Sequence, residues 1–442
     1  MKVLFVNDSA TSSNWGDRAA AISLRAMIGQ RGGQIIHTVT EQNLWDSSFG
    51  MPATVLADAG RRSMRDRARD TARLWLPPIL LDARRRARSR GTGAGQDQHL
   101  LIPQSWEDFA PAAQQVLRER RYGWPAVLRA IDDADVMVIH GASLHGGGYL
   151  PRTDLFLTYL AKTRFGTPVV IANHTADLEY PPLRRMAEHV YPLFDDVVYR
   201  DPISPERWGS VCGGRFAADT AFWFEPASKE AWAPLARRAT YLDVWPDTAS
   251  FDPSEPYLCV GGSSIFHERR DWASVLNGYD GLIRQLQSGY RGTIVLTASA
   301  DLDLPIFRAL AERFDLPLVG VTTPVQQAVD ILGSADAYIG GRWHPSIFAL
   351  RGGTPLLALS SQTFKMRALA EITGSSMAFN ALDLGRHAEA IGRELEVVLE
   401  QGDGLRSRLR TRAGDMAENS WDNVAYLTGH HARSGANGDA RA

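Results

Sequence analysis

The stretch ADAYIGGRWHPSIFAL, residues 335–350, decides the fold class. Its first six residues form a short apolar run of the kind that makes a buried strand, and two glycines mark the exit from it. Pro345 suits the first position of the helix that we expect next. Arg342 and His344 then fall between the carboxyl end of a strand and the N-terminus of a helix. Repeated units of this kind are typical of α/β folds with parallel sheets.

The same pattern recurs on both sides of this stretch. Short apolar runs predict strands at 2–7, 136–140, 168–172 and 196–199, and again at 257–261, 292–298, 316–321, 335–340 and 355–359. Helical spacing of apolar residues appears between them at 19–28, 305–314 and 325–332. The predicted fold class is therefore α/β, with two doubly wound (Rossmann-like) domains that face a cleft. Open sheets of this type bind ligands outside the carboxyl ends of their strands.

Changes in composition set the expected domain boundaries. We expect an N-terminal α/β domain at 1–230, with an Arg-rich insertion at about 45–130 placed between its first two strands. A stretch rich in Pro, Ala and charge at 231–256 is typical of a linker. The C-terminal α/β domain then covers 257–430 and carries the Arg-x-His motif. Residues 431–442 have nothing to bury, so they are expected to be a loose tail.

Bulk composition excludes several classes of protein. The chain has 442 residues, 44% of them hydrophobic, and a net charge of -2, which fits a globular protein and gives no general attraction to nucleic acid. The start of the chain is expected to be a strand and not a signal peptide, and no stretch has the roughly 18 apolar residues of a membrane span. The two cysteines, Cys212 and Cys259, suggest neither disulfides nor a thiolate metal site. A cytoplasmic protein is expected.

The part of the insertion from Arg61 to Arg90 has eleven Arg against three Asp, and it also contains the apolar run LWLPPILL. One interpretation is a solvated helical hairpin whose Arg stems cover its own apolar strip. The other is a surface that contacts anionic membrane or a lipid-linked acceptor, because interfacial attachment uses basic residues beside Trp and Leu. The second interpretation implies a peripheral position at the inner face of the plasma membrane.

The segment from Arg342 to His344 is the strongest candidate for chemistry. Free N–H groups and the positive end of the dipole gather at a helix N-terminus, and a guanidinium and an imidazole beside them suit a phosphate or carboxylate. In the structural alternative, Arg342 pairs with a neighbouring Asp and His344 caps the helix. We favour a functional role, since two such groups at the edge of a sheet rarely serve structure alone.

A second junction follows the strand predicted at 196–199. Arg200 lies just past this strand, and Ser204 is a candidate N-cap with Pro205 at the first helical position. Two arginines, Arg200 and Arg342, delivered from two domains to one cleft would hold a small anion by its carboxylate and its phosphate.

Further candidates follow other strands. Asn14, Gly16 and Asp17 precede the first helix, where Asp17 is a candidate N-cap and Gly16 allows close approach of a ligand to the backbone. Gly147 and Gly148 form a glycine turn suited to a phosphate or sugar.

Lys365 follows the last predicted strand, and its ammonium can reach the same cleft or remain solvated. His140, His145 and His174 have no carboxylate or cysteine at ligand spacing, so no metal site is expected.

Taken in order, these motifs resemble the polysaccharide pyruvyl transferase family. The motifs are Asn14-x-Gly16-Asp17, Gly147-Gly148, Arg200-Asp201-x-x-Ser204, Ala218-Asp219, Arg342-x-His344 and Lys365. The resemblance implies a fold similar to GT-B glycosyltransferases, phosphoenolpyruvate as the donor and co-substrate, and no cofactor. It also implies a sugar of a cell-envelope glycan or exopolysaccharide, free or as a lipid-linked oligosaccharide, as the acceptor.

The resemblance further assigns roles to single residues. Arg200 and Arg342 would hold the carboxylate and phosphate of phosphoenolpyruvate, while His344 would bind phosphate and is a candidate proton donor. Lys365 would neutralise the departing phosphate.

Two other functions remain open. A nucleotide-sugar glycosyltransferase of GT-B-like fold would need an acidic residue for the ribose, for which Glu371 is a candidate. A non-catalytic phosphosugar-binding protein would keep the fold without turnover. Loss of the site residues would favour that reading, but Arg200, Arg342, His344 and Lys365 are all present.

Overall fold

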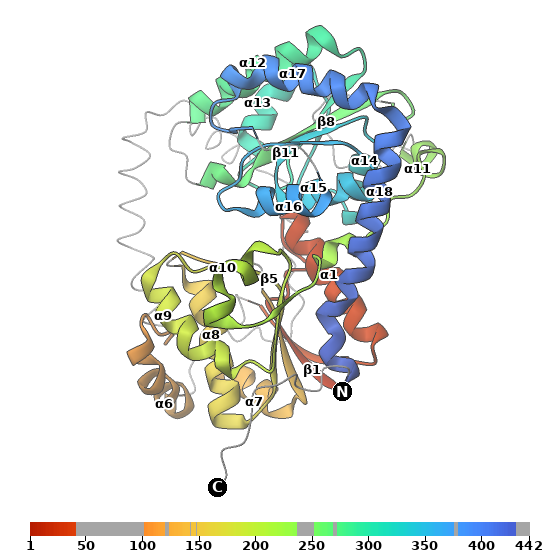
Figure 1. The fold of residues 1–442 in the computed structure, drawn as a ribbon. Helices are drawn as coiled ribbons and strands as arrows, with labels where there is room; N and C mark the ends of the chain where they lie inside the picture. Colours follow the sequence, from red (N-terminus) through yellow and green to blue (C-terminus); the bar gives the residue numbers. More distant parts are fainter. Residues whose placement is uncertain are drawn as a thin grey trace.

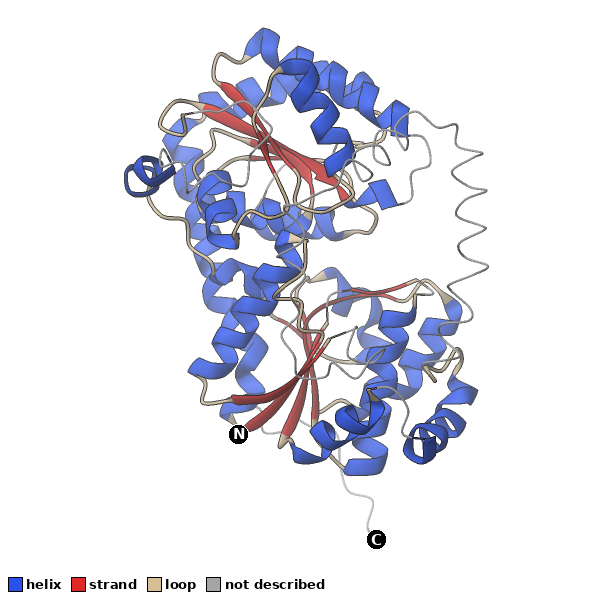
Figure 2. Ribbon diagram, turned by 180° about the vertical axis from the view of Figure 1, so that it is seen from behind, coloured by secondary structure: helices blue, strands red, loops and turns tan. Residues whose placement is uncertain are grey.

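The protein consists of two α/β domains, stacked one above the other in Figure 1, each built on a parallel sheet. The computed structural model describes residues 1–40, 101–119, 123–141, 143–146, 148–236, 252–267, 272–374 and 379–429. In both domains the sheet is the middle layer and helices cover both of its faces (Figure 2). This arrangement explains why the strands are nearly continuous apolar runs, because both of their faces are buried.

The first domain contains a sheet in the order β2-β1-β3-β5-β6-β7, with β4 paired to β5, and all pairs are parallel. Its strands are β1 (Lys2–Val6), β2 (Gln34–Val39), β3 (Val136–His140), β4 (Ser143–His145), β5 (Val169–Asp177), β6 (Asp196–Tyr199) and β7 (Arg215–Phe216). Its longer helices are α1 (Trp15–Gln30), α6 (Phe109–Glu119), α7 (Trp124–Asp133), α8 (Tyr149–Leu160), α9 (Pro181–Val190) and α10 (Ile203–Cys212), and the short η4 (Thr220–Trp223) follows β7. Short turns at η1 (Trp106–Asp108), η2 (Ala161–Phe165) and η3 (Tyr191–Leu193) complete it.

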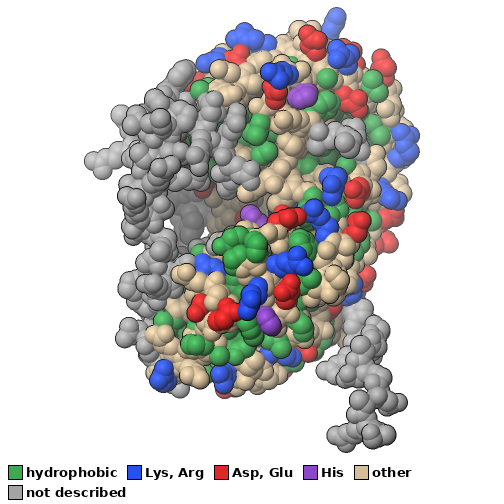
Figure 3. Space-filling view, turned by 60° about the vertical axis from the view of Figure 1, so that its left-hand side comes forward, with side chains coloured by type: hydrophobic (Ala, Val, Ile, Leu, Met, Phe, Trp, Pro, Cys, Tyr) green, Lys and Arg blue, Asp and Glu red, His purple; other side chains and the backbone are tan. Residues whose placement is uncertain are grey.

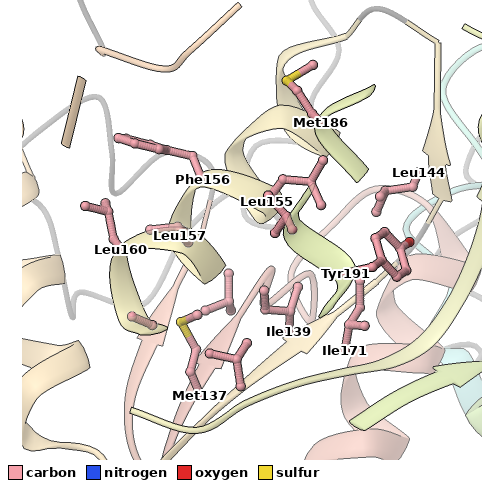
Figure 4. Packing of buried hydrophobic residues seen from close by; sticks show 14 of the residues in the cluster. Met137, Ile139, Leu144, Leu155, Phe156, Leu157, Leu160, Ile171, Met186 and Tyr191 are labelled. Carbon is pink, nitrogen blue, oxygen red and sulfur yellow. The ribbon is translucent and has the colours of Figure 1, made fainter. Parts of the chain in front are cut away.

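The core of this domain lies between the sheet and helices α8 and α9. Figure 4 shows Met137 and Ile139 of β3 and Ile171 of β5 facing Leu155 of α8, with Tyr191 closing the cluster. All of these side chains are almost completely excluded from water. Burial of this much apolar surface fixes β3, β5 and β6, so the residues that follow those strands are held on a rigid base.

The second domain contains a sheet in the order β10-β9-β8-β11-β12, again with parallel pairs. Its strands are β8 (Tyr257–Ser263), β9 (Thr293–Thr297), β10 (Leu318–Val319), β11 (Tyr338–Gly341) and β12 (Leu356–Ala358). Its helices are α12 (Trp272–Gly289), α13 (Leu304–Phe314), α14 (Val325–Gly333), α15 (Trp343–Arg351), α16 (Lys365–Thr373), α17 (Leu384–Glu400) and α18 (Gly402–Asn419). Helix α11 (Lys229–Ala236) follows the first domain in sequence and packs on the second, where the indole N–H of Trp232 donates to Oγ of Ser334 at 2.8 Å. The elements η5 (Ser264–His267) and η6 (Ser420–Thr428) are 3-10 helices.

Helix α1 belongs to the first domain by sequence but docks into the second. Trp15 is fully buried in a cluster with residues of α14 and α15, and its Nε1 donates to the carbonyl of Gly320 at 3.1 Å. The buried guanidinium of Arg18 donates to the carbonyl of Thr323 at 2.6 Å. In the other direction, α18 and η6 return from the second domain to the first (Figure 1, blue). The two domains are therefore tied together at both ends of the chain.

The predicted strands and their parallel arrangement are confirmed, with boundaries shifted by a few residues. The prediction missed β2, a strand that is only partly buried and so lacks a continuous apolar run. For this reason the placement of the insertion between the first two strands was wrong: the segment follows β2, and its end from 101 onward contains η1, α6 and α7.

Several sequence predictions fall outside the described residues. They concern the Arg-rich segment 61–90, Gly147, most of the linker and the tail at 431–442. Within the described ranges, no helix combines the length and apolar character that crossing a membrane requires.

Candidate functional site

Asp219 lies at the centre of the site. It follows β7 in the first domain and is completely buried, and its Oδ1 caps η4 by accepting the N–H of Ala221 at 2.8 Å. Its Oδ2 accepts from Nη1 of Arg200 at 3.3 Å and from Nε1 of Trp343 at 2.9 Å, and it lies 3.4 Å from Nε2 of His344. One carboxylate oxygen thus joins groups from both domains.

The Asp219 carboxylate is ionised in this environment. Burial by itself would raise its pKa, but the charge and contact of His344, followed by those of Arg200, bring the pKa of Asp219 well below its usual range. A buried carboxylate is stable only when it is paired in this way.

Arg200 stands where the sequence placed it, immediately after β6. Its Nε donates to Oγ1 of Thr175 at 3.0 Å, and its guanidinium carbon lies 5.9 Å from the ring centre of Trp343. With only 3% of its surface exposed, Arg200 is held in one orientation by groups on both sides of the domain boundary.

Arg342 follows β11 and pairs with Asp303 of the second domain, to which its Nη2 donates at 2.6 Å. Burial raises the pKa of Asp303, although the Arg342 charge acts in the opposite direction. Arg342 therefore makes the pairing with an aspartate that the structural alternative requires. This pairing occupies only part of the guanidinium, because the buried Nε of Arg342 has no hydrogen-bond partner among the described residues. An unsatisfied buried donor of this kind is a group available to an anionic ligand.

His344 lies against Gly16 of α1. A Cβ at Gly16 would overlap the imidazole, so the ring packs directly on the first turn of that helix. The missing side chain at Gly16 therefore makes room for His344 of the other domain, whereas the sequence pattern predicted room for a ligand.

The helix starts differ from the predictions. Asn14, and not Asp17, caps α1, because its side-chain oxygen accepts from the N–H groups of Gly16 and Asp17 at 2.9 and 3.4 Å. Helix α15 begins at Trp343, so Pro345 occupies its third position and not its first.

Ser204 is also not an N-cap. Helix α10 begins one residue earlier, at Ile203, and the Asp201 carboxylate accepts from the Ser204 N–H at 2.8 Å and from its hydroxyl at 2.9 Å. The Ser204 hydroxyl accepts from the N–H of Ala176 at 3.0 Å and is fully buried. Ser204 thus joins the start of α10 to β5 by hydrogen bonds.

Lys365 begins α16 and is close enough to the first domain to be influenced by its charges. Burial, followed by the positive charge of Arg200, lowers the pKa of Lys365 to about 7, against the opposing effect of Asp17, Asp201 and Asp219. A lysine titrating near neutrality beside an arginine is a feature of functional sites.

His140, at the end of β3, is a further member of the site. Burial and the charge of Arg200 lower its pKa, while Asp17 and Asp219 act in the opposite direction. Its ring contacts the carbonyl of Asn7 at 3.4 Å and the side-chain amide of Asn173 at 3.5 Å. His140 therefore lies at the first-domain side of the same charge cluster.

The remaining glycine and histidine candidates lie elsewhere. Gly148 precedes α8 as its N-cap residue, and Gly147 is outside the described residues. His174 is structural: its Nδ1 contacts the carbonyl of Val198 at 2.9 Å, and burial lowers its pKa to about 3. Across the described part of the chain, no three His, Cys, Asp or Glu side chains gather as metal ligands would.

Sequence reasoning did not assign a role to Asp219 or Asp303. Asp219 appears there only as part of a motif, and Asp303 is not named. Asp219 lies three residues past β7 and Asp303 six residues past β9, and a position after a strand end was the available signal. What could not be inferred is that Asp219 contacts residues 124 and 125 positions away. In the space-filling view, charged side chains of both signs gather at the level where the two domains meet (Figure 3).

The candidate ribose ligand of a nucleotide sugar, Glu371, lies on the exposed side of α16. Its Oε1 is 3.7 Å from Nε of Arg367, and the two side chains are each more than half exposed. Glu371 is therefore separate from the buried cluster around Asp219.

Solved structures with a similar fold include a putative UDP-N-acetylglucosamine 2-epimerase from Listeria monocytogenes, at 11% identity and a TM-score of 0.53, with 97% of this chain and 96% of that chain covered. The UDP-GlcNAc 2-epimerase from Neisseria meningitidis bound to UDP-GlcNAc gives the same identity and TM-score, with 97% and 99% covered. Likeness at this level shows the fold alone, and together with the two parallel sheets it confirms an α/β fold of two Rossmann-like domains.

The comparison of sequences is more specific. A search among curated proteins found no match. The model of the family described as polysaccharide pyruvyl transferase matches residues 14–363, which span the site from Asn14 to His344 and end two positions before Lys365. Because this match covers most of the chain, the chain belongs to the polysaccharide pyruvyl transferase family.

Proposed function

We propose that this protein transfers a pyruvyl group from phosphoenolpyruvate to a pair of hydroxyls on a sugar, forming a ketal and inorganic phosphate. The observation that carries the proposal is the meeting of Arg200 and His344, one from each domain, at the single oxygen of Asp219. A reaction on a small trianion needs cationic groups on several sides, and this junction supplies them.

Binding of the donor is assigned to Arg200, Arg342 and Lys365. Arg342 has a buried donor without a partner among the described residues, and a carboxylate or phosphate oxygen would satisfy it. The ammonium form of Lys365 suits the phosphate, whose charge increases as its bond to carbon breaks.

The reaction begins with protonation of the CH2 carbon of phosphoenolpyruvate, which turns the neighbouring carbon into an oxocarbenium-like centre. One sugar hydroxyl bonds to that centre. The second hydroxyl then bonds to it as the carbon–oxygen bond to phosphate breaks, and phosphate leaves with the electron pair. The two sugar hydroxyls lose one proton each. In the overall balance, one proton is gained by the new methyl group and the other by the leaving phosphate.

His344 is the proposed proton donor, because it packs between Asp219 and the N-terminus of α1 and is held there from both domains. General acid catalysis requires such a group to be fixed near the reacting carbon.

The proposed acceptor is a sugar of a cell-envelope or exopolysaccharide glycan, free or lipid-linked. Together with the Arg-rich segment 61–90, a lipid-linked acceptor would place the enzyme in the cytoplasm, peripherally at the inner face of the plasma membrane. No cofactor and no nucleic acid have a part in this proposal.

The test is the transfer reaction itself, with phosphoenolpyruvate labelled with 13C at the enol carbon, run in D2O with a panel of mono- and disaccharides and lipid-linked sugars. We expect release of inorganic phosphate, a 13C signal of a quaternary ketal carbon and one deuterium in the new methyl group. Transfer of a sugar from UDP- or GDP-sugars, with phosphoenolpyruvate left intact, would instead support a glycosyltransferase. Binding of a phosphosugar without any turnover would support the non-catalytic alternative.

A further inference from the structure

The last described elements of the chain form a strap between the domains. The C-terminal strap, defined as α18 and η6 (residues 402–428), runs from the second domain to the first and packs beside α1 and η4 (Figure 1). It lies wholly beyond residues 14–363, the part of the chain that matches the family. Apolar side chains such as Val424 and Trp421 dock it on the first sheet, next to Val3 and Phe5.

Two asparagines of the strap hold the backbone of one residue of the first domain, Ala218. The side-chain oxygen of Asn419 accepts from the N–H of Ala218 at 2.7 Å, and the side-chain nitrogen of Asn423 donates to the carbonyl of Ala218 at 2.9 Å. Asn423 is 1% exposed and Ala218 is fully buried. Both polar groups of Ala218 are therefore fixed by the strap.

The residue after Ala218 is Asp219, the centre of the site. Its other neighbour, Thr220, is held by the same network: the N–H of Thr220 donates to Oδ1 of Asn173 at 2.8 Å, and the N–H of Asn173 donates to Oδ1 of Asn423 at 2.8 Å. Asn423 thus supports the backbone on both sides of Asp219.

We propose that Asn419 and Asn423 are positioning residues of the active site, which fix Asp219 so that Arg200 and His344 meet at its carboxylate. Apolar contacts also hold η6 against the first sheet, so the two amides are not the whole attachment of the strap. A buried amide is retained where its hydrogen bonds set a unique geometry. The predicted effect of the two asparagines on phosphoenolpyruvate binding rests on the proposed function. Their predicted effect on the position of Asp219 does not.

Asn419 accepts a hydrogen bond from Ala218, whereas Asn423 donates one to it. Substitutions that remove only the donor or only the acceptor therefore test the two residues separately. Asn423→Asp keeps the oxygen that accepts from Asn173 but loses the donor to Ala218, whereas Asn419→Asp keeps the oxygen that accepts from Ala218. Asn419→Ala removes that acceptor. Thr428→Ala is the matched control on the strap, since the Thr428 hydroxyl donates to a carbonyl of the same turn, that of Ala425, at 2.8 Å.

The first readout is the indole N–H signal of Trp343 in NMR spectra of protein with 15N-labelled tryptophan, assigned with Trp343→Phe. This N–H donates to Asp219, so it reports the position of that carboxylate without any turnover. We expect the signal to move in Asn423→Asp and Asn419→Ala and to stay in Asn419→Asp and Thr428→Ala.

The second readout is the affinity for phosphoenolpyruvate, measured by calorimetry. We expect at least about tenfold weaker binding in Asn423→Asp, which loses its donor to both Ala218 and Ser420, and about tenfold weaker binding in Asn419→Ala, which loses one acceptor. Binding should be unchanged in the other two variants. Asn419 is only partly buried, so Asn419→Ala decides the question if Asn423→Asp does not fold.

Two outcomes separate this inference from the proposed function. If the wild type binds no phosphoenolpyruvate, the Trp343 signal alone decides whether the strap positions Asp219. An unmoved Trp343 signal in folded Asn423→Asp and Asn419→Ala protein would overturn the inference, whatever the protein binds.

Discussion

At the scale of single residues, the site is organised by one buried charge. The Asp219 carboxylate brings Arg200 next to Trp343 and His344, although these groups come from different domains. Arg342 is held separately, by its hydrogen bond to Asp303 in the second domain. A ligand with two anionic ends would connect the two arginines, which is how the proposed donor fits this arrangement.

The contact between Gly16 and His344 makes a prediction at this scale. Gly16→Ala should weaken phosphoenolpyruvate binding at least about tenfold, because the new methyl group would displace the imidazole. Gly29→Ala is the matched control in the same helix: nothing lies near its Cβ position, and the change should stabilise the protein by about 0.5–1 kcal/mol. Calorimetry and thermal unfolding of both variants check this. Equal affinities in the two variants would contradict the placement of His344.

Lys365 predicts a dependence on pH. Because its pKa is lowered to about 7, this lysine is largely neutral at pH 8 in the free protein, whereas a bound phosphate favours the ammonium form. Binding of phosphoenolpyruvate at pH 8 should therefore take up a proton, and the affinity should fall as the pH rises above about 7. Below that pH this lysine is already charged, so its contribution to the dependence should disappear.

Calorimetry at pH 8 in two buffers of different ionisation enthalpy measures this proton. Lys365→Met should abolish the uptake, while Lys162→Met, on a surface lysine that pairs with Asp195 at 2.8 Å, should retain it. Identical heats in both buffers for the wild type would show that Lys365 does not change its protonation.

At the scale of elements, three helix starts converge on the site: α1, α15 and α16. Sequence patterns predicted that these helices exist and that each follows a strand, because apolar periodicity is a property of the segment itself. Their first residues were predicted less well. Asn14 and Asp17 are both residues that cap helices, and only the backbone conformation, extended at Asn14, decides between them.

This cap leads to a prediction about α1. Asn14→Ala should lower the stability of the protein by about 1 kcal/mol, since two N–H groups of the first turn lose their acceptor. Asn14→Ser should keep most of the stability, because a hydroxyl can replace the amide oxygen. Urea unfolding of the two variants checks this. An unchanged midpoint in Asn14→Ala would argue against the cap.

At the scale of the whole molecule, the parts that sequence reasoning could not reach are those that cross between domains. The parallel sheets could be predicted, since their strands are buried on both faces and carry continuous apolar runs. The meeting of Asp219 with His344 and the return of residues 420–428 to the first sheet depend on long-range packing, which leaves no local pattern. The candidate site residues could therefore be picked out one by one from the sequence, while the contacts that the two carboxylates make with them could not.

The Arg-rich segment also belongs to this scale. Deleting 61–90 should weaken binding to anionic liposomes and leave phosphoenolpyruvate affinity unchanged, because the site is built from other parts of the chain. Changing Arg84, Arg85 and Arg86 together to Gln should weaken liposome binding in part, and more so at low salt. Liposome flotation of the three proteins measures this. Undiminished flotation after the deletion would exclude the segment as a membrane contact.

The measurement that tests the central claim most directly is calorimetric titration of the purified protein with phosphoenolpyruvate, set beside UDP- and GDP-sugars. Arg342→Ala and His344→Ala are the test variants, and Arg393→Ala, which removes an exposed guanidinium that lies 3.8 Å from Glu389 on α17, is the control. We predict saturable binding of phosphoenolpyruvate by the wild type and the control, and its loss in both test variants. Binding of a nucleotide sugar with no response to phosphoenolpyruvate would contradict the account.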